Sequence, residues 1–494
     1  MGINIFDGVS YRNNSKGMMA FRKSIHEPLK HSAYNAKVRK QSIQEKIFPI
    51  GFFVVLLTGF QLTRIKIGPL PIYFSEIFAL FLLLKSFSNS KNIKPPANRQ
   101  IPVYYTLFFI FIFIGEVHGA IAYGFFLPAI FQIYRYGLGV FLIFSLPRLI
   151  KTDEQFNILL RAVVIGIIIT ASLSIFSSLP VTRPFARICF SNPFVDSSKA
   201  RGLEKYDQMR GEQGVRGSSL IGPAPFTGAY LCILWPLSVL AHQRSKNNKK
   251  WKTLSAFASI IAPIGALMTY SRMSYLGIIL ILGVVALFGK SGSRKLPILF
   301  IIMASIVLGT IGLHSKYFYF ERIQNRTIAT FDDPLSSADV SERFLSYTEA
   351  IKYFYGHPVY LFCGAGSAGD KMADRGEVSA LIYDQLSLPT HSAFAWSIYG
   401  FGLGGGLCQL ALMMSSLILI LKNILSVKRK KSDGQSTWPL LFAVWLGGLL
   451  PWWLFGHGVV STARGAMFMA FIFSIFLVCE QLGYQNVANS KKLS

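Results

Sequence analysis

The sequence predicts an all-α membrane protein, a polytopic bundle of about twelve transmembrane helices with a large extracytoplasmic loop that contains an amphipathic helix. Three observations predict this class. Of the 494 residues, 52% are hydrophobic and only 15% are charged, whereas charged residues make up about a quarter of an average soluble domain. Many separate apolar runs reach the roughly 20 residues that a helix needs to cross a bilayer core. Lys and Arg collect in short loops on one predicted side, which is typical of cytoplasmic loops.

The apolar runs give the order of the spans along the chain. The predicted spans are 47–63, 70–86, 102–119, 123–147, 156–179, 223–241, 253–270, 273–289, 296–313, 397–421, 437–456 and 463–482. The loops that this order places in the cytoplasm, such as 243–252 and 422–431, are rich in Lys and Arg and nearly free of acids. One missed or extra span would put some of these loops on the wrong side, so a count of twelve is self-consistent.

This order divides the chain into three regions. Residues 1–46 form a basic cytoplasmic tail, 47–482 form the transmembrane domain, and 483–494 form a cytoplasmic C-terminal tail. The first region is polar before any apolar run begins, so no cleavable signal peptide is predicted. Both termini are expected on the cytoplasmic side of the membrane.

Two long intervals fall on the extracytoplasmic side, at about 180–222 and 314–390. Connections of this length usually have a function, so we expect the functional side of the protein to face outward. In the second interval, residues 339–358 have the apolar spacing of an amphipathic helix that ends at Gly356 and Pro358. We expect this helix to lie on the membrane surface or across the mouth of a cavity.

Several function classes are disfavoured by composition and motifs. The net charge of +27 would suggest nucleic acid in a soluble protein, but here it follows from the cytoplasmic loops, so no nucleic-acid partner is expected. No zinc motif, phosphate-binding loop, dinucleotide fingerprint or Ser-His-Asp signature appears, and neither a metal nor a cofactor is predicted. Cys189 and Cys363 fall in extracytoplasmic loops, and the sequence leaves open whether they pair.

Two arginines on the outer side are candidates for phosphate binding. Arg272 lies in a very short turn between two apolar spans. It is either an interfacial arginine that reaches the lipid head groups or a guanidinium that binds phosphate with two hydrogen bonds. Arg343 begins the apolar stripe of the amphipathic helix, and it either pairs with Glu342 or Asp339 in solvent or points at whatever the helix covers.

His391 is the candidate general base. Thr390 is a suitable N-cap, which would put His391 in the first turn of a helix, where the helix dipole favours the neutral imidazole. A neutral histidine at the membrane surface can accept a proton from a sugar hydroxyl, although a lone histidine at a helix start is more often structural. The glycines that follow, between Gly400 and Gly406, allow close helix packing or form a hinge.

Other ionisable residues have less certain roles. Arg216, at the entry to the sixth span, is a further candidate for the outer site. Ionisable residues inside spans are costly and usually face the bundle interior, where they pair or shape a cavity. The residues of this kind, or close to it, are Arg135, Arg161, Glu76, Glu116 and Arg464, and the sequence does not assign their partners.

Four stretches together resemble the bacterial O-antigen ligase and polymerase family of membrane glycosyltransferases. They occur in the order of the family's motifs, namely "VRGSSLIGPAPFTGAYLCILWPL" (215–237), "MTYSRMSYLGIILIL" (268–282), "SERFLSYTEAIKYFYGHPVYLFCGAGSAGD" (341–370) and "THSAFAWSIYGFGLGGGL" (390–407). The resemblance implies transfer of a glycan from a polyprenyl diphosphate, usually undecaprenyl diphosphate, to an acceptor hydroxyl outside the cytoplasmic membrane.

The resemblance also implies roles for individual residues. Arg272 and Arg343 fall where the family has diphosphate-binding arginines, Arg216 matches a further arginine, and His391 falls where the family has its catalytic histidine. The acceptor would be a growing glycan or the lipid A core, with membrane lipids and polysaccharide-assembly proteins as further partners. Ser392 departs from the family, which often has Asn or His after the histidine, so the acceptor stays open.

Two other function classes remain possible from the sequence. A transporter or flippase of lipid-linked glycans also has about twelve spans, but the matching halves that are common in transporters are not visible here. A non-catalytic assembly scaffold would leave the two arginines and the histidine unexplained. The enzyme is therefore the preferred hypothesis.

Overall fold

The computed structural model describes residues 49–57, 65–67, 70–88, 98–124, 126–179, 181–190, 216–222, 224–245, 248–288, 358–366, 392–430, 437–455 and 463–493. In these ranges the chain is almost entirely helical. The exception is an antiparallel hairpin in which β1 (Ile65–Ile67) pairs with β2 (Leu70–Ile72), so that Ile65 lies opposite Ile72. The predicted all-α class therefore holds for these ranges apart from one short hairpin.

The helices follow one another along the chain with short connections wherever both neighbours are described. They are α2 (Phe74–Ser88), α3 (Gln100–Tyr123), α4 (Phe126–Leu149), α5 (Asp153–Ser178), α6 (Arg183–Phe190), α8 (Ala224–Arg244), α9 (Lys249–Leu267), α10 (Arg272–Phe288), α14 (Pro358–Cys363), α17 (Ala393–Lys430), α18 (Thr437–Ala443), the π-helix η5 (Val444–Leu449), α19 (Leu450–Phe455) and α20 (Ala463–Leu493).

Seven helical segments in the described ranges are long and apolar enough to cross a membrane. They are Gln100–Tyr123, Phe126–Leu149, Asp153–Ser178, Ala224–Arg244, Ala393–Ser426, Thr437–Leu454 and Gly465–Gly483. Each overlaps a predicted span, and α10 is a shorter apolar helix at the position of another. The predicted span 296–313 and the amphipathic helix at 339–358 lie outside the described residues, so the count of twelve stays a prediction.

The second predicted span differs from the structure at its start. Residues 70–72 were predicted to be helical, but they form strand β2, and α2 begins only at Phe74. Pro71 lies in the strand and favours extended backbone at the residue before it, which a helix cannot continue through easily. The helix is fixed at its start by Glu76, whose Oε2 accepts a hydrogen bond from the Tyr73 amide at 3.2 Å.

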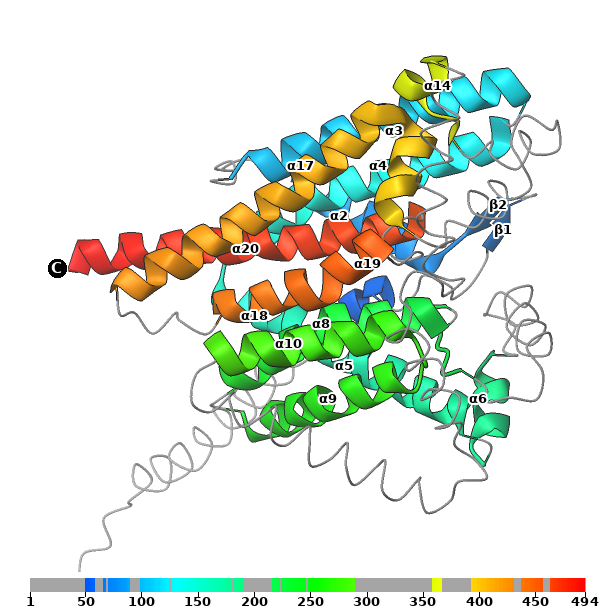
Figure 1. Ribbon diagram of the computed structural model, residues 1–494. Coiled ribbons are helices and arrows are strands. Elements are labelled where there is room, and N and C mark those ends of the chain that lie inside the picture. The colour runs from blue at the N-terminus through cyan, green and yellow to red at the C-terminus, as the bar shows by residue number, and fades with distance from the viewer. Residues whose placement is uncertain are drawn as a thin grey trace, which may run out of the picture. The chain divides into compact units, whose positions relative to one another are not determined.

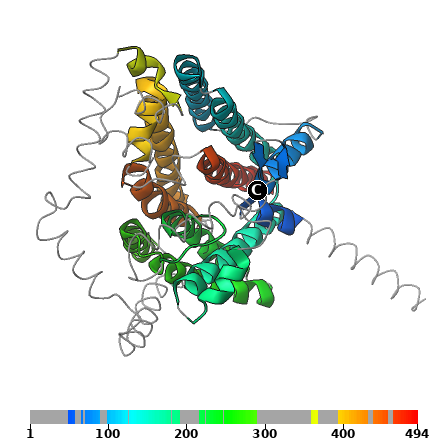
Figure 2. The ribbon, with the colours of Figure 1, turned by 90° about the vertical axis from the view of Figure 1, so that its right-hand side faces the viewer.

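The helices pack in two groups. α18 and α19 lie between them, since each contacts α10 of the first group and α17 of the second. In the first group α5, α8 and α9 contact one another, and α10 contacts α8 (Figure 1). In the second group α20 packs on α4, α3 packs on α4 and α17, and α2 packs on α4. Figure 2 shows these helices nearly along their axes, as expected for a bundle of membrane-spanning helices.

Apolar side chains cover both the interior and the outer surface. α8 and α20 are buried along most of their length, with residues such as Trp235 and Phe471 almost inaccessible. Large apolar residues on the other helices are exposed, for example Ile121 at 70% and Ile130 at 61% of their side-chain surface. A soluble protein rarely exposes so many, whereas lipid tails cover such a surface in a membrane. The protein is therefore an integral membrane protein.

Candidate active site

Arg272 is positioned by the tight connection between α9 and α10. α9 ends at Leu267, and α10 begins at Arg272 itself. In between, Tyr270 has a φ of 49°, which is uncommon for a residue with a Cβ atom and marks stored backbone strain. The Thr269 hydroxyl donates to the Ala266 carbonyl at 2.6 Å and bonds the Ser274 hydroxyl at 3.1 Å, so it ties the two helix ends together.

Arg216 comes to the same connection from a distant part of the sequence. One guanidinium nitrogen of Arg216 donates to the Tyr270 carbonyl at 2.9 Å, two residues before Arg272. The amide of Gly217 donates to the Met268 carbonyl at 2.7 Å. A Cβ atom at Gly217 would lie 2.8 Å from that carbonyl oxygen, so only glycine allows this approach. The structure thus brings together two of the arginines that the sequence selected.

The segment after Arg216 is held against α5 and α8 by hydroxyl groups. The Ser218 amide donates to the Ser177 hydroxyl at 2.8 Å, and this hydroxyl donates in turn to the Ser218 carbonyl at 3.0 Å. The Ser219 hydroxyl bonds that of Thr227 on α8 at 2.9 Å. Buried hydroxyls with satisfied hydrogen bonds fix a backbone segment rigidly, so the site around Arg216 is preorganised.

The glycine-rich segment that follows His391 contains a break in α17. Phe401 (φ −132°, ψ 15°) and Gly402 (φ 70°, ψ 179°) are not helical, so α17 consists of two helical parts. A Cβ atom at Gly402 would overlap the Phe362 carbonyl of α14 and would lie 2.9 Å from that of Leu361. Both sequence interpretations of these glycines therefore apply, because the helix is broken and also packs closely.

The loop after α14 fits into this break. Ala365 donates its amide to the carbonyl of Tyr399 at 3.1 Å, and the flanking Gly364 and Gly366 have positive φ. From α3, the His118 ring Nδ1 lies 2.8 Å from the Gly364 carbonyl. Sequence reasoning missed His118, although a histidine within an apolar run is a signal that could have found it.

The described segment that contains α17 begins directly after His391 in the chain. The helix begins at Ala393, and Ser392 is its N-cap because the Ser392 hydroxyl accepts a hydrogen bond from the Ala395 amide at 3.2 Å. Thr390, which the sequence predicts to be the cap, and His391 lie outside the described residues, so their placement in the first turn stays a prediction.

The start of α17 and helix α10 both contact α19. The Ser392 hydroxyl donates to the Trp453 carbonyl of α19 at 3.4 Å, and the ring of Phe394 packs on Trp453 with centroids 5.1 Å apart. α19 also contacts α10, the helix that begins at Arg272. Ser392 and α10 therefore both pack against α19.

Comparison with known proteins assigns the segment that contains these features. Residues 257–410 match the family described as O-antigen ligase. The chain carries an O-antigen ligase domain. The matched segment includes Arg272, Arg343 and His391, and Arg216 precedes it. No curated protein matches the chain.

The O-antigen ligase domain and the membrane-spanning helices support a membrane glycosyltransferase-type function in polysaccharide biosynthesis. Of the four predicted site residues, the structure describes Arg216 and Arg272, and both are half-buried. Arg343 and His391 lie outside the described residues.

Within the described ranges, no group of three or more His, Cys, Asp or Glu residues could hold a metal ion. Cys189 and Cys363 are both free thiols.

The structure assigns partners to two of the ionisable residues that lie inside spans. The Arg135 Nε atom pairs with Glu76 Oε1 at 2.7 Å, with side-chain exposures of 11% and 1%. The Arg135 guanidinium also lies 5.4 Å from the ring centroids of Tyr73 and Phe131. This buried pair joins α4 to α2 and carries no net charge, so its immediate role is structural.

The remaining ionisable residues divide between the two ends of the bundle. Glu116 is 1% exposed and lies beside the α14 loop, since a Cβ atom at Gly366 would be 2.8 Å from the Glu116 Cα. Arg161 stacks on the ring of Trp251 at the start of α9, with 5.1 Å between the guanidinium carbon and the ring centroid. Arg464 belongs to α20, near its start.

Proposed function

We propose that the protein transfers a glycan from a polyprenyl diphosphate, such as undecaprenyl diphosphate, to an acceptor hydroxyl on the outer side of the cytoplasmic membrane. The observation that carries the proposal is the meeting of Arg216 and Arg272 at the connection between α9 and α10. Two arginines that the fold brings to one connection suit a diphosphate, which offers several oxygen acceptors in a small space.

The reaction needs one bond to form and one to break. The acceptor oxygen attacks the first sugar carbon, the bond from that carbon to the diphosphate oxygen breaks, and the polyprenyl diphosphate leaves. In this proposal Arg272, Arg343 and Arg216 stabilise the negative charge that develops on the leaving group. His391 takes the proton of the attacking hydroxyl. The lipid diphosphate is itself the leaving group, so the proposed mechanism uses neither a metal nor a cofactor.

The proposed site faces the exterior, and the basic tails at 1–46 and 483–494 lie in the cytoplasm. This orientation rests on the Lys and Arg residues of the predicted cytoplasmic loops. The acceptor is a growing surface polysaccharide, which would make the protein a polymerase, or the lipid A core, which would make it a ligase. Both share the donor and the leaving group, so the same residues serve either reaction.

Reconstitution tests this function against the transporter hypothesis. The full-length protein is placed in liposomes with a polyprenyl-diphosphate-linked glycan, an acceptor glycan and a chelator of divalent metal ions. We expect a lengthened or ligated glycan together with one free polyprenyl diphosphate per transfer. Movement of the intact lipid-linked glycan across the bilayer, with no polyprenyl diphosphate released, would instead identify a transporter.

A further inference from the structure

A second basic site lies at the ends of α8 and α9 that are far from Arg216 and Arg272. A cavity of about 340 Å³ lies between α5, α8 and α9, and its polar lining includes Arg161, Arg244, Asn157 and Asn248. α8 ends at Arg244 and α9 begins at Lys249, whereas Arg216 and Arg272 lie near the opposite ends of these helices. A helix the length of α8 spans about 30 Å, so the cavity and the proposed active site lie near opposite membrane surfaces.

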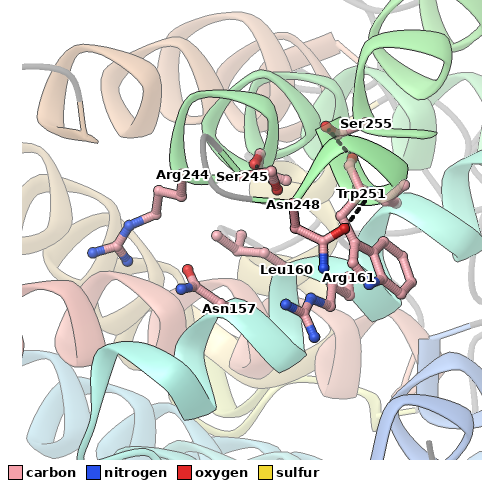
Figure 3. Close-up of a pocket in the computed structure, with 10 residues that line it drawn as sticks. Asn157, Leu160, Arg161, Arg244, Ser245, Asn248, Trp251 and Ser255 are labelled. Atoms are coloured by element: carbon pink, nitrogen blue, oxygen red, sulfur yellow. Dashed lines mark hydrogen bonds between the residues drawn. The ribbon is translucent and has the colours of Figure 1, made fainter. Parts of the chain in front are cut away.

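Both guanidinium groups of the cavity lie over aromatic rings, and Figure 3 shows Arg161 beside Trp251. Arg161 lies over Trp251, and Arg244 lies over Phe156 at 5.0 Å from its centroid. An arginine that stacks through its face keeps its N–H groups directed outward in the plane, where they can meet an anion. The Asn248 side chain accepts a hydrogen bond from the Trp251 amide at 3.3 Å and so fixes the start of α9 beside them.

The two arginines differ in their partners. Arg244 donates to Asp153 Oδ1 at 2.5 Å, and both side chains of that pair are partly exposed. Arg161 is half-buried and interacts electrostatically with Glu154, but among the residues that the structure describes it makes no hydrogen bond or ion pair. A partly desolvated guanidinium whose N–H groups lack hydrogen-bond acceptors is costly, and an anionic ligand in the cavity would supply acceptors.

Asn157 is a second polar group of the cavity that lacks a hydrogen-bond partner among the described residues. Its side-chain oxygen is buried and has no hydrogen-bond donor among the residues that the structure describes. Asn157 and Arg161 are one helical turn apart on α5 and line the same cavity. A ligand that carries both a phosphate and a hydroxyl group would satisfy the guanidinium and the amide oxygen together.

The charges around the cavity also favour an anion. The first turn of α5 contributes two acids, Asp153, which pairs with Arg244, and Glu154, which interacts electrostatically with Arg161. The first turn of α9 contributes three exposed lysines, Lys249, Lys250 and Lys252. Basic pockets between transmembrane helices at the cytoplasmic surface are suited to phospholipid head groups.

We propose that this cavity binds a phosphate ester that carries a hydroxyl group, at the membrane surface opposite the proposed active site. The structure favours an anionic phospholipid with a glycerol-type head group as the source. Leu254 and Phe257 are 40% and 49% exposed on α9, the helix that contributes Trp251 and Ser255 to the cavity, and acyl chains of a bound lipid could lie along it. A soluble glycerol phosphate offers the same chemistry without the chains.

Binding to the full-length protein in detergent tests this site. The delipidated protein is titrated with short-chain phosphatidylglycerol, with phosphatidylcholine of the same chain length, and with glycerol phosphate, and bound ligand is counted by native mass spectrometry. The variants are Arg161→Gln and Asn157→Ala. Arg148→Gln is the matched control, because Arg148 lies in the last turn of α4 and does not line the cavity.

A lipid site predicts that wild type and Arg148→Gln bind phosphatidylglycerol alike, that phosphatidylcholine binds weakly, and that Arg161→Gln binds phosphatidylglycerol at least about tenfold more weakly. Glycerol phosphate bound with the same pattern of variants would keep the site and identify a soluble ligand as its source. If Arg161→Gln does not fold, Asn157→Ala decides, with several-fold weaker binding expected. Unchanged binding by the folded variants, or no binding by the wild type, would overturn the site, and neither result depends on glycan transfer.

Discussion

Arg272 is the residue whose position says most about the proposed chemistry. It begins α10 directly after a connection that contains the strained residue Tyr270, whose carbonyl receives the Arg216 guanidinium. Strain of this kind persists only where the surrounding structure fixes it, and it is frequent in active sites. The connection therefore positions one arginine directly and the other through a hydrogen bond.

Arg272→Lys tests whether the planar guanidinium matters beyond its charge. Lysine keeps the charge but cannot bind two diphosphate oxygens in one plane, so we expect the transfer rate to fall about tenfold or more. The measurement is the rate of glycan transfer in liposomes at equal protein amounts. Arg187→Lys, on the exposed surface of α6, is the control and should transfer at the wild-type rate. Equal rates for both variants would mean that Arg272 only anchors the helix at the membrane surface.

The buried pair of Glu76 and Arg135 gives a prediction about stability. Removing one partner, as in Glu76→Leu or Arg135→Met, should lower the free energy of unfolding by about 3–5 kcal/mol, because the other charge is left buried and unpaired. The double variant should recover most of this loss. Thermal unfolding in detergent checks the order of the three midpoints, and a double variant less stable than either single one would refute this role.

Individual residues also show what the sequence can predict. Arg272 and Arg216 were selected because basic residues at predicted helix ends are visible in the sequence. Their proximity in the fold is not visible in the sequence, since the hydrogen bond from Arg216 to Tyr270 joins positions 54 residues apart. The pairing of Glu76 with Arg135 spans 59 residues, and nothing in the local sequence of either indicates the other.

At the scale of elements, α17 packs closely against α14 and α3. The break at Gly402 accepts α14, and Gly115 of α3 allows the same approach, since a Cβ atom there would lie 2.9 Å from the Cys363 carbonyl. Gly404 lies against the ring of Phe111. These contacts fix the helix that follows His391 in the chain.

Gly402→Ala tests this junction. The backbone at Gly402 is in a region that is essentially restricted to glycine, so we expect the free energy of unfolding to fall by about 1–3 kcal/mol from strain, with the overlap on Phe362 adding to the loss. Gly283→Ala is the matched control in α10, where a Cβ atom would meet nothing within 4 Å. The unfolding midpoint should drop for the first variant and stay or rise for the second. No drop for Gly402→Ala would mean that the break does not constrain the helix.

The elements show a second limit of sequence prediction. Apolar length located the spans because it depends only on composition, which is why the seven membrane-crossing segments coincide with predicted ones. The π-helix η5 within the predicted span 437–456 was not predicted, because it depends on close packing of Gly448 against Ile233 of α8 and of Gly447 against Ile281 of α10.

At the scale of the whole molecule, α8 and α9 run between the segments that contain Arg216 and Arg272 and the cavity lined by Arg161 and Arg244. The proposed active site and the proposed lipid site thus lie at opposite ends of one rigid helix group. In the proposed mechanism, His391 accepts the proton of the attacking hydroxyl and so has the most direct chemical role.

Replacement of His391 tests the central claim most directly. The measurement is glycan transfer by full-length His391→Ala, compared with wild type and with His242→Ala at the other end of α8, whose ring Nδ1 lies 3.1 Å from the Lys252 carbonyl. Loss of a general base should lower the rate by about 10²–10⁴-fold while the protein's level in the membrane stays normal, and His242→Ala should match the wild type. Unchanged glycan length and yield with His391→Ala would contradict the proposed transferase mechanism.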